Sequence, residues 1–336
     1  MSPQSAIKRF MFRLLTILLL LNAASAQEDG DAGSARSQTD KTISQIIDLE
    51  PVDSQRKRVV PIRVYLPTSA QLHPVVLVSH GLGGSRDSKA YLGRSWSQAG
   101  FACVFLQHAG SDRDVIRTIR PGERMETLRQ AANAANNLAR IKDVSFAIDQ
   151  LHAWNEQSDH ALFRKLDLAH IGMSGQSFGA ATTLSVAGRM YPLHKNYYEP
   201  RITAFLALSP QPARELSLEQ TFGKLQVPIM CMTGTKDTSP IDAGVTAEAR
   251  QAVYQAMPPG DKYQLVLAGG EHHAFGDERL WGRAARNPNH HPAIVAITTK
   301  FWQAYLEDDA DAKAWLQSDQ PRTDAKLASE DVWQWK

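Results

Sequence analysis

Two features are scarce in this chain of 336 residues. Cysteine occurs only at Cys103 and Cys231, too few for a disulfide framework or a cysteine-based zinc site. Net charge is also small: the chain has 37 Lys and Arg and 35 Asp and Glu, which gives a formal net charge of +2. This balance provides neither the basic surface that binds nucleic acid nor a polybasic membrane patch. The remainder, 43% hydrophobic and 21% charged residues, suits a globular chain held together by packing.

A hydrophobic run near the N-terminus predicts processing. Basic residues between positions 8 and 13 precede the apolar run 14–21, and a small-residue cleavage site ends at Ala26, which is the pattern of a secretory signal peptide. The alternative is a membrane anchor, but the run is about half of the roughly 20 residues that span a bilayer. No cysteine near the cut offers a lipid attachment site. We predict a signal peptide over 1–26, a polar disordered leader over 27–41 and a secreted or periplasmic mature protein.

From residue 42 onward, short apolar segments alternate with helical ones. Most short segments are continuously apolar, as expected for parallel strands covered on both faces. The predicted strands are 58–65, 75–79, 101–107, 168–173, 202–208, 228–233 and 263–267, and the predicted helices are 89–98, 141–154, 178–189, 247–256 and 292–306. This alternation predicts a mostly parallel, doubly wound α/β sheet in a single domain over 42–336. The wide gap between strands predicts an insertion around 109–140, over one end of the sheet.

The most informative segment is Gly175-Gln-Ser-Phe-Gly179, which follows a predicted strand and opens a predicted helix. Alone, G-x-S-x-G is a weak pattern, because glycine and serine are common. Between a strand and a helix it is a nucleophile elbow, whose glycines let the two elements pass without Cβ clashes. The helix dipole also favours negative charge at this end. We therefore predict that Ser177 is a catalytic nucleophile.

A second glycine-rich segment, His80-Gly-Leu-Gly-Gly84, follows the strand predicted at 75–79. Tetrahedral intermediates of acyl transfer need backbone N–H donors, and such a loop can supply one while the residue after the nucleophile supplies the other. We predict an oxyanion hole formed by the amides of Leu82 and Phe178. His80 is an alternative base, but it precedes the serine, against the order Ser, Asp, His. A loop-organising role through hydrogen bonds to the backbone is expected for it instead.

The acid and the base are expected on loops that follow later strands. Asp237 comes after the strand 228–233, and His272 comes after the strand 263–267. In the predicted roles, His272 takes the proton of the nucleophile and Asp237 holds the imidazole tautomer and stabilises the imidazolium. Asp242 is a weaker candidate for the acid because it lies further past its strand. His273 competes with its neighbour as the base.

The motifs His80-Gly-Leu-Gly and Gly175-Gln-Ser-Phe-Gly resemble those of secreted α/β-hydrolases. This group includes platelet-activating-factor acetylhydrolases and bacterial dienelactone-hydrolase-like and polyester-hydrolase-like esterases, and the resemblance covers about residues 59–316. It implies an α/β-hydrolase fold with about eight strands and a serine esterase (carboxylesterase) that works through an acyl-enzyme without a metal or an organic cofactor. The acetylhydrolases carry the acid after the strand that follows the nucleophile helix. This chain has no carboxylate there, and Asp237 matches the position used in polyester hydrolases.

The substrate that the resemblance implies is a small-molecule or polymeric ester. The charge balance argues against nucleic acid as a partner. The same machinery could cleave an amide or peptide bond, and a non-catalytic binding protein on a hydrolase scaffold is the alternative from another class. If the strands follow the order usual in this fold, four inter-strand steps of about 4.8 Å separate Cys103 from Cys231. The resulting separation of roughly 19 Å far exceeds the ~7 Å limit for a bridge. We predict two buried free thiols.

Two other clusters have simpler interpretations than ligand binding. His290 and His291, with Asp277 nearby in the sequence, could suggest a metal site, but adjacent loop histidines rarely face one ion, and a rigid turn is expected. Five arginines between positions 113 and 129 could meet an anionic substrate. They are interleaved with acids, which favours a solvated helix face.

Overall fold

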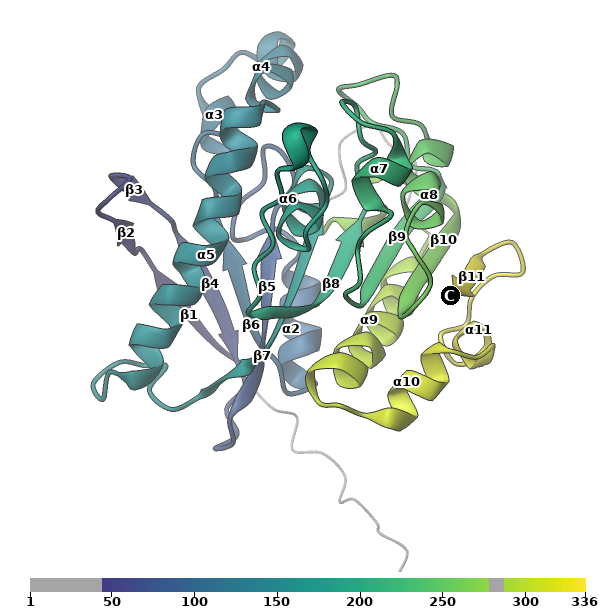
Figure 1. Ribbon diagram of the computed structural model, residues 1–336. Helices are drawn as coiled ribbons and strands as arrows, with labels where there is room; N and C mark the ends of the chain where they lie inside the picture. The colour runs from purple at the N-terminus through teal and green to yellow at the C-terminus, as the bar shows by residue number, and fades with distance from the viewer. Residues whose placement is uncertain (1–43, 278–286) are drawn as a thin grey trace, which may run out of the picture. The chain divides into compact units, whose positions relative to one another are not determined.

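A computed structural model describes residues 44–277 and 287–336 (Figure 1). The predicted signal peptide and leader lie outside the described residues. The elements belong to one compact unit, Lys41–Lys336, built on a sheet of nine strands in the order β1-β4-β6-β5-β7-β8-β9-β10-β11. In that order the strands are β1 (Gln45–Leu49), β4 (Ile62–Leu66), β6 (Ala102–Leu106), β5 (His73–Ser79), β7 (Leu166–Gln176), β8 (Ile202–Leu208), β9 (Ile229–Lys236), β10 (Lys262–Glu271) and β11 (Val332–Trp335). A separate hairpin joins β2 (Val52–Asp53) and β3 (Arg58–Val59).

The prediction of an α/β chain with a mostly parallel sheet is confirmed. The strands from β6 to β10 run parallel, while β1 with β4, β4 with β6 and β10 with β11 pair antiparallel. The helices are α2 (Ala90–Gln98), α3 (Asp114–Arg117), α4 (Arg124–Ala131), α5 (Ala134–Glu156), α6 (Phe178–Val186), α7 (Leu218–Phe222), α8 (Ala247–Gln255), α9 (His290–Leu306), α10 (Ala310–Leu316) and α11 (Gln320–Asp324). Short 3₁₀ turns occur at η2 (Pro121–Glu123), η3 (Pro192–His194) and η4 (His272–Phe275).

Both faces of the sheet are covered, which explains the continuously apolar strands. In β5, Val75 and Leu77 join a core with α5, α6 and α8, whereas Val76 and Val78 join a second core with α2 and α9. Figure 1 shows α5 and α6 in front of the sheet and α2 behind it. Because successive side chains of a strand point to opposite faces, both sets have to be apolar.

The structure corrects several predicted boundaries. The segment 58–65 divides into β3 and β4 around Pro61, which has no N–H to donate to a ladder. Helix α5 starts at Ala134 instead of 141, because the side chain of Asn133 accepts the Asn136 amide at 2.9 Å and caps it. The insertion therefore ends near Asn133 and holds α3, η2 and α4, which lie above the carboxyl ends of the parallel strands (Figure 1).

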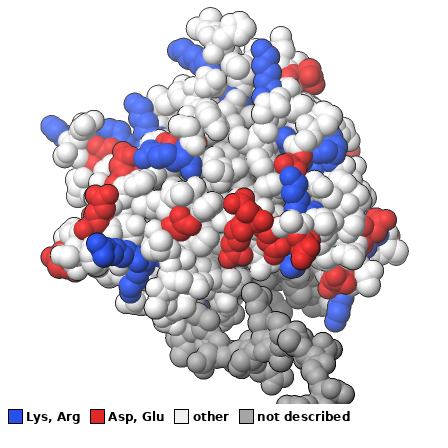
Figure 2. All heavy atoms as spheres, turned by 60° about the horizontal axis from the view of Figure 1, so that its bottom comes forward, with Lys and Arg blue, Asp and Glu red and all other residues white. Residues whose placement is uncertain are grey.

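The cysteine prediction is confirmed: Cys103 in β6 and Cys231 in β9 are buried, free and four strand steps apart. Charges of both signs occur on the face at the amino ends of the parallel strands (Figure 2). Within residues 44–277 and 287–336, no helix combines the length and the apolar character needed to cross a membrane.

Candidate active site

Ser177 stands at the sharp turn between β7 and α6. Its backbone has φ 57° and ψ −115°, a conformation that costs a non-glycine residue about 1–3 kcal/mol and persists only where its surroundings enforce it. A Cβ atom on Gly175 would lie 2.2 Å from the carbonyl oxygen of Gly179, and one on Gly179 would lie 2.1 Å from the carbonyl oxygen of Ser79. Only glycine at both positions allows this approach. The packing thus holds Ser177 at the carboxyl edge of the sheet.

Residues 80–84, named here the glycine loop, pass beside this turn. A Cβ atom on Gly81 would lie 3.7 Å from the Cβ of Ser177. Among the described residues, the backbone amides of Leu82 and Phe178 donate to no acceptor. Phe178 is the first residue of α6, where helical N–H groups lack an intrahelical partner. The amides predicted to bind an oxyanion therefore belong to two segments that meet at the serine, and both are available.

The predicted acid and base are hydrogen-bonded to each other. Asp237 follows β9 and His272 follows β10, and His272 Nδ1 lies 2.7 Å from Asp237 Oδ1. Because a carboxylate only accepts, Nδ1 carries the proton and Nε2 keeps its lone pair. Thr233 Oγ1 donates to the other carboxylate oxygen at 2.9 Å. Asp237 is fully buried, whereas 15% of the His272 side chain is exposed, so the histidine is the member of the pair that a ligand can reach.

A buried arginine that sequence analysis missed supports this pair. Arg250 in α8 donates through Nε to the carbonyl oxygen of Asp237 at 2.9 Å and through Nη1 to that of Ser209 at 2.9 Å. Its Nε also lies 3.2 Å from Asp237 Oδ1. In the sequence, Arg250 occupies an ordinary position of an amphipathic helix, where arginine is usually exposed. Its burial depends on contacts with the segments that follow β8 and β9, and it has no local signal in the sequence.

The electrostatics favour a neutral histidine beside an ionised acid. Burial lowers the pKa of His272, and the hydrogen bond to Asp237 offsets only part of this effect; the charges of Arg250 and Lys89 lower it further. Burial alone would raise the pKa of Asp237, but the hydrogen bond from His272 and the charge of Arg250 outweigh it and lower that pKa. At neutral pH His272 can therefore accept a proton.

The competing candidates for the base and the acid have other partners. His273, the alternative base, has its Nδ1 3.3 Å from Glu271. Asp242, the weaker candidate for the acid, forms an ion pair with Arg214. Of the predicted alternatives, the structure brings only Asp237 and His272 together.

His80 organises the glycine loop, as expected from the sequence. Its Nε2 accepts the amide of His108 at 3.0 Å, and its Nδ1 donates to the carbonyl oxygen of Gly81 at 2.6 Å. Burial and the charge of Arg140 lower the pKa of His80 well below its ordinary value, so the ring is neutral. Both ring nitrogens are engaged with the backbone, and neither is free to act as a base.

The serine turn and the histidine turn are linked through Gln176, whose Nε2 donates to the carbonyl oxygen of His272 at 3.1 Å. Among the described residues, Ser177 Oγ forms no hydrogen bond with His272 or with another group. In ligand-free enzymes this contact is often long and tightens when substrate binds. Gln176 fills a variable position of the G-x-S-x-G motif, so the motif does not mark it.

His290 and His291 are the first two residues of α9, so the turn expected at these positions is wrong; the turn before the helix ends at Asn289. The ring of His291 stacks on Tyr91 with 3.7 Å between centroids. Asp277 accepts the amides of Ala90 and Tyr91 at 2.5 and 3.3 Å, at the start of α2. Within the described part of the chain, no group of three or more His, Cys, Asp or Glu side chains could hold a metal ion.

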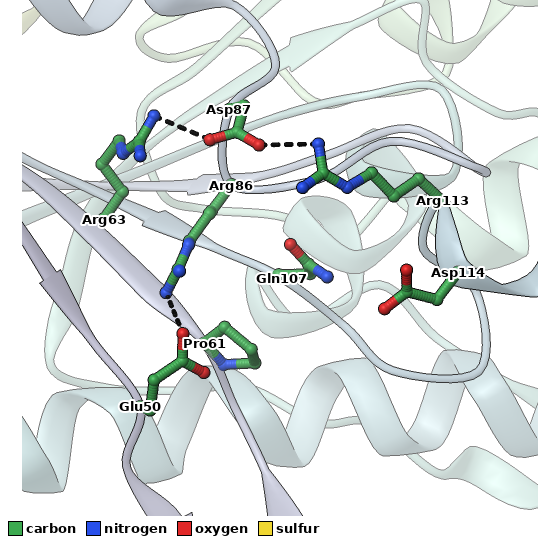
Figure 3. Close-up of a pocket in the computed structure, with 8 residues that line it drawn as sticks. All are labelled: Glu50, Pro61, Arg63, Arg86, Asp87, Gln107, Arg113 and Asp114. Carbon is green, nitrogen blue, oxygen red and sulfur yellow. Dashed lines mark hydrogen bonds and ion pairs between the residues drawn. The ribbon is translucent and has the colours of Figure 1, made fainter. Parts of the chain in front are cut away.

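A charged pocket of about 470 Å³ is lined by other residues than those of the candidate site (Figure 3). Its arginines are ion-paired: Arg63 with Asp87 at 2.7 Å, Arg86 with Glu50 at 2.7 Å and Arg113 with Asp87 at 2.8 Å. Ser177, Asp237 and His272 do not line it. The lining residues are Glu50, Pro61, Arg63, Arg86, Asp87, Gln107, Arg113 and Asp114. Three arginines and three acidic side chains line the pocket, so its charges balance. The ion pairs of Arg86 and Asp87 hold the segment that follows the glycine loop.

The arginines of the insertion are exposed and lie beside acidic residues, as the predicted solvated face requires. Arg113 and Arg117 are 58% and 75% exposed, and Arg117 lies 3.6 Å from Asp114. Arg129 is exposed and pairs with Glu126.

No protein-family model matches this chain, and no curated protein matches it.

Proposed function

We propose that this protein is a serine hydrolase of the α/β-hydrolase fold that cleaves carboxylic esters through an acyl-enzyme intermediate. The observation that carries the proposal is the 2.7 Å contact between His272 Nδ1 and Asp237 Oδ1, at the sheet edge where Ser177 occupies a strained strand-to-helix turn. This set of residues, in chain order Ser, Asp, His, is the arrangement that activates a serine for acyl transfer.

The chemistry follows from the tautomer. His272 Nε2 accepts the Ser177 proton while the oxygen attacks the ester carbonyl carbon, and Asp237 stabilises the imidazolium that forms. The tetrahedral intermediate then collapses, the carbonyl–alkoxy bond breaks, and His272 returns the proton to the departing alcohol. Water attacks the acyl-enzyme in the same way and releases the acid. The lowered pKa of His272 supports this role, because the base has to be neutral at the start.

The negative charge that develops on the carbonyl oxygen needs donors. The available amides of Leu82 and Phe178 would supply them, and the loss of one such donor typically costs about 10²–10³ in rate. The N-terminus of α6, where Phe178 lies, adds the favourable end of a helix dipole.

We further propose that the chain has the α/β-hydrolase fold that its motifs resemble and that it is exported. The four strand steps between the cysteines are those that the hydrolase fold implies, and the sheet of nine strands is compatible with that fold. With the predicted signal peptide over 1–26, the enzyme would act on esters outside the cytoplasm.

Ser177→Ala tests the proposal. Purified enzyme and variant are compared on p-nitrophenyl esters, with circular dichroism to verify the fold. We expect the variant to lose turnover to background while its unfolding temperature stays near that of the wild type. A serine-directed phosphonate should label the wild type, and mass mapping should place the adduct on Ser177. Undiminished turnover, or an adduct on another residue, would refute the assignment.

The bond type and the acyl chain need a second measurement. A panel of p-nitrophenyl esters of increasing acyl length, with p-nitroanilides of the same acids, reports both. We expect the esters to be cleaved faster than the anilides, and the preferred length bounds the acyl pocket. Faster cleavage of the anilides would favour an amidase.

A further inference from the structure

Arg140 in α5 is a fully buried cation that contacts both segments meeting at the proposed nucleophile. Its Nη1 donates to the carbonyl oxygen of His80 at 2.7 Å, at the first peptide of the glycine loop. Its guanidinium carbon lies 4.5 Å from the centroid of the Phe178 ring, a cation–π contact with the first residue of α6. Its Nε donates to Ser111 Oγ at 2.8 Å. One side chain thus connects the loop, the helix start and the insertion.

Among the described residues, Arg140 forms no direct ion pair with a carboxylate, and the charges of Asp143 and Asp112 act on it only from a distance. The buried acid Asp143, in the next turn of α5, already accepts from Arg56 at 2.7 Å, from Arg58 at 2.8 Å and from His108 Nδ1 at 2.9 Å. The close acceptors of Arg140 are neutral oxygens. Burying a guanidinium costs free energy, and an apolar side chain of similar size would avoid that cost. The presence of arginine here therefore points to the geometry that it imposes.

The same cluster contains a second Ser–His–Asp arrangement. Ser79 Oγ lies 2.9 Å from His108 Nε2, and His108 Nδ1 lies 2.9 Å from Asp143 Oδ2. All three side chains are fully buried, so no substrate reaches Ser79. Burial lowers the pKa of His108 to about 4, which keeps the ring neutral. These residues brace the end of β5, from which the glycine loop starts.

The beginning of the insertion holds the other side of the loop. The amide of Gly83 donates to the carbonyl oxygen of Ser111 at 2.9 Å, and the amide of Arg113 donates to that of Gly84 at 2.7 Å. Because Ser111 is itself bound by Arg140, the residues on both sides of Leu82 are fixed through this arginine.

We propose that Arg140 is a positioning residue that keeps the amides of Leu82 and Phe178 aligned as one oxyanion hole. The inference rests on the proposed function, because a tetrahedral oxyanion is what gives these amides a common target. Since the complete loss of one donor costs about 10²–10³ in rate, misalignment through Arg140→Met should lower kcat by about 10–100-fold. KM should stay within about threefold, because the ground-state carbonyl gains little from these donors.

The experiment measures kcat and KM on a p-nitrophenyl ester for the wild type and Arg140→Met, with active sites titrated by a phosphonate. Inhibition by a trifluoromethyl ketone, which forms a tetrahedral adduct, should weaken by the same factor as kcat, while the matching plain ketone should bind equally well to both. Hydrogen exchange should be faster in the peptide covering residues 80–84. An unchanged kcat per titrated site, or unchanged exchange of this peptide, would overturn the inference.

Arg201→Met is the control for an arginine that binds α5 away from the glycine loop; its side chain is 33% exposed. Arg201 also binds α5, with Nη1 2.6 Å from Asp149, and it pairs with Glu199 at 2.8 Å; within the described residues, none of its hydrogen bonds or ion pairs reaches the glycine loop. It should lower the unfolding temperature and leave kcat per titrated site unchanged. If Arg140→Met does not fold, Ser111→Ala removes the hydroxyl that Arg140 holds without opening a large cavity, and it should lower kcat severalfold. Equal kcat in Ser111→Ala and the wild type would then overturn the inference.

The two proposals fail differently. If Ser177→Ala retains full turnover, the proposed function fails whatever Arg140 does. If Ser177→Ala is inactive but Arg140→Met keeps its kcat and its exchange pattern, only the positioning role is wrong.

Discussion

Replacement of Asp237 by asparagine separates the charge of the acid from its shape. The amide oxygen of asparagine can take the place of Oδ1, which faces His272 Nδ1 at 2.7 Å and Arg250 Nε at 3.2 Å. The amide nitrogen then faces Thr233 Oγ1, a hydroxyl that can accept as well as donate. Arg250 favours this orientation because it repels an NH₂ group. We therefore expect the variant to keep the tautomer of His272 and to lose only the negative charge.

The magnitude follows from Coulomb's law. A unit charge about 4 Å from the developing imidazolium is worth about 4 kcal/mol at an effective dielectric constant of about 20. This energy corresponds to about 10³ in kcat/KM. If the amide were reversed, His272 would hold the wrong tautomer and the loss would approach about 10⁴. The measured factor thus reports whether Arg250 sets the orientation.

Stability and pH dependence should change in defined directions. Asp237 and Arg250 are both fully buried, and breaking a buried pair costs about 3–5 kcal/mol. Because the fold lowers the pKa of Asp237, its contribution is present above the ordinary aspartate pKa of about 3.9 and is lost as the pH falls through the folded pKa. The stability gap between wild type and variant should therefore narrow in acid. Asp237 raises the pKa of His272, so the acid limb of kcat/KM should move to lower pH in the variant.

The assay is kcat/KM for a p-nitrophenyl ester as a function of pH, corrected for the folded fraction from urea unfolding. Asp242→Asn is the control. That carboxylate pairs with Arg214 and not with His272, so its loss should leave the rate unchanged. A kcat/KM for Asp237→Asn within about tenfold of the wild type would refute the reasoning, because it is far less than the Coulomb energy requires.

Three further results are expected. Lys89 is buried, and its charge lowers the pKa of His272, so Lys89→Met should move the acid limb of kcat/KM to higher pH; a shift to lower pH would contradict this. Gly179→Ala would place a Cβ 2.1 Å from a backbone oxygen and should abolish turnover, whereas Gly122→Ala, with no atom within 4 Å, should be silent; an active Gly179→Ala variant would disprove the close packing of the elbow. The proposed mechanism uses no metal, so EDTA should leave esterase activity intact, and a loss restored by a divalent cation would contradict the mechanism.

The central strands could be predicted because parallel strands buried on both faces carry a strong local signal. The edge strands could not. In β1 the residues Gln45, Ile46 and Asp48 are exposed, and β11 is a short C-terminal segment, Val332–Trp335, with its first residue exposed. Edge strands need only one partner and tolerate polar residues, so their pairing is decided by the finished sheet. This accounts for nine strands where about eight were expected.

In the candidate site, too, some residues could be predicted from the sequence and others could not. Ser177 and the glycine loop follow local motifs, and Asp237 and His272 follow strands, so chain order and the topology of parallel sheets were enough to name them as candidates. The choice of His272 over His273 and of Asp237 over Asp242 needed the contact between the two side chains. Arg250 and Arg140 were missed because a buried arginine looks like a solvated one in the sequence. Their burial arises from contacts with residues far away along the chain, such as Ser209 and His80.

Within the described residues, Ser79, His108 and Asp143 form a hydrogen-bonded Ser–His–Asp set beside the proposed set of Ser177, His272 and Asp237. Both place histidine Nδ1 against a carboxylate, at 2.7 Å for His272 and 2.9 Å for His108. Ser79, however, is a fully buried strand residue already hydrogen-bonded to its histidine, whereas Ser177 sits in a strained turn beside available amides. A nucleophile needs access and an oxyanion site in addition to a base. We therefore infer that the set built on Ser79 supplies rigidity to the loop on which the set built on Ser177 depends.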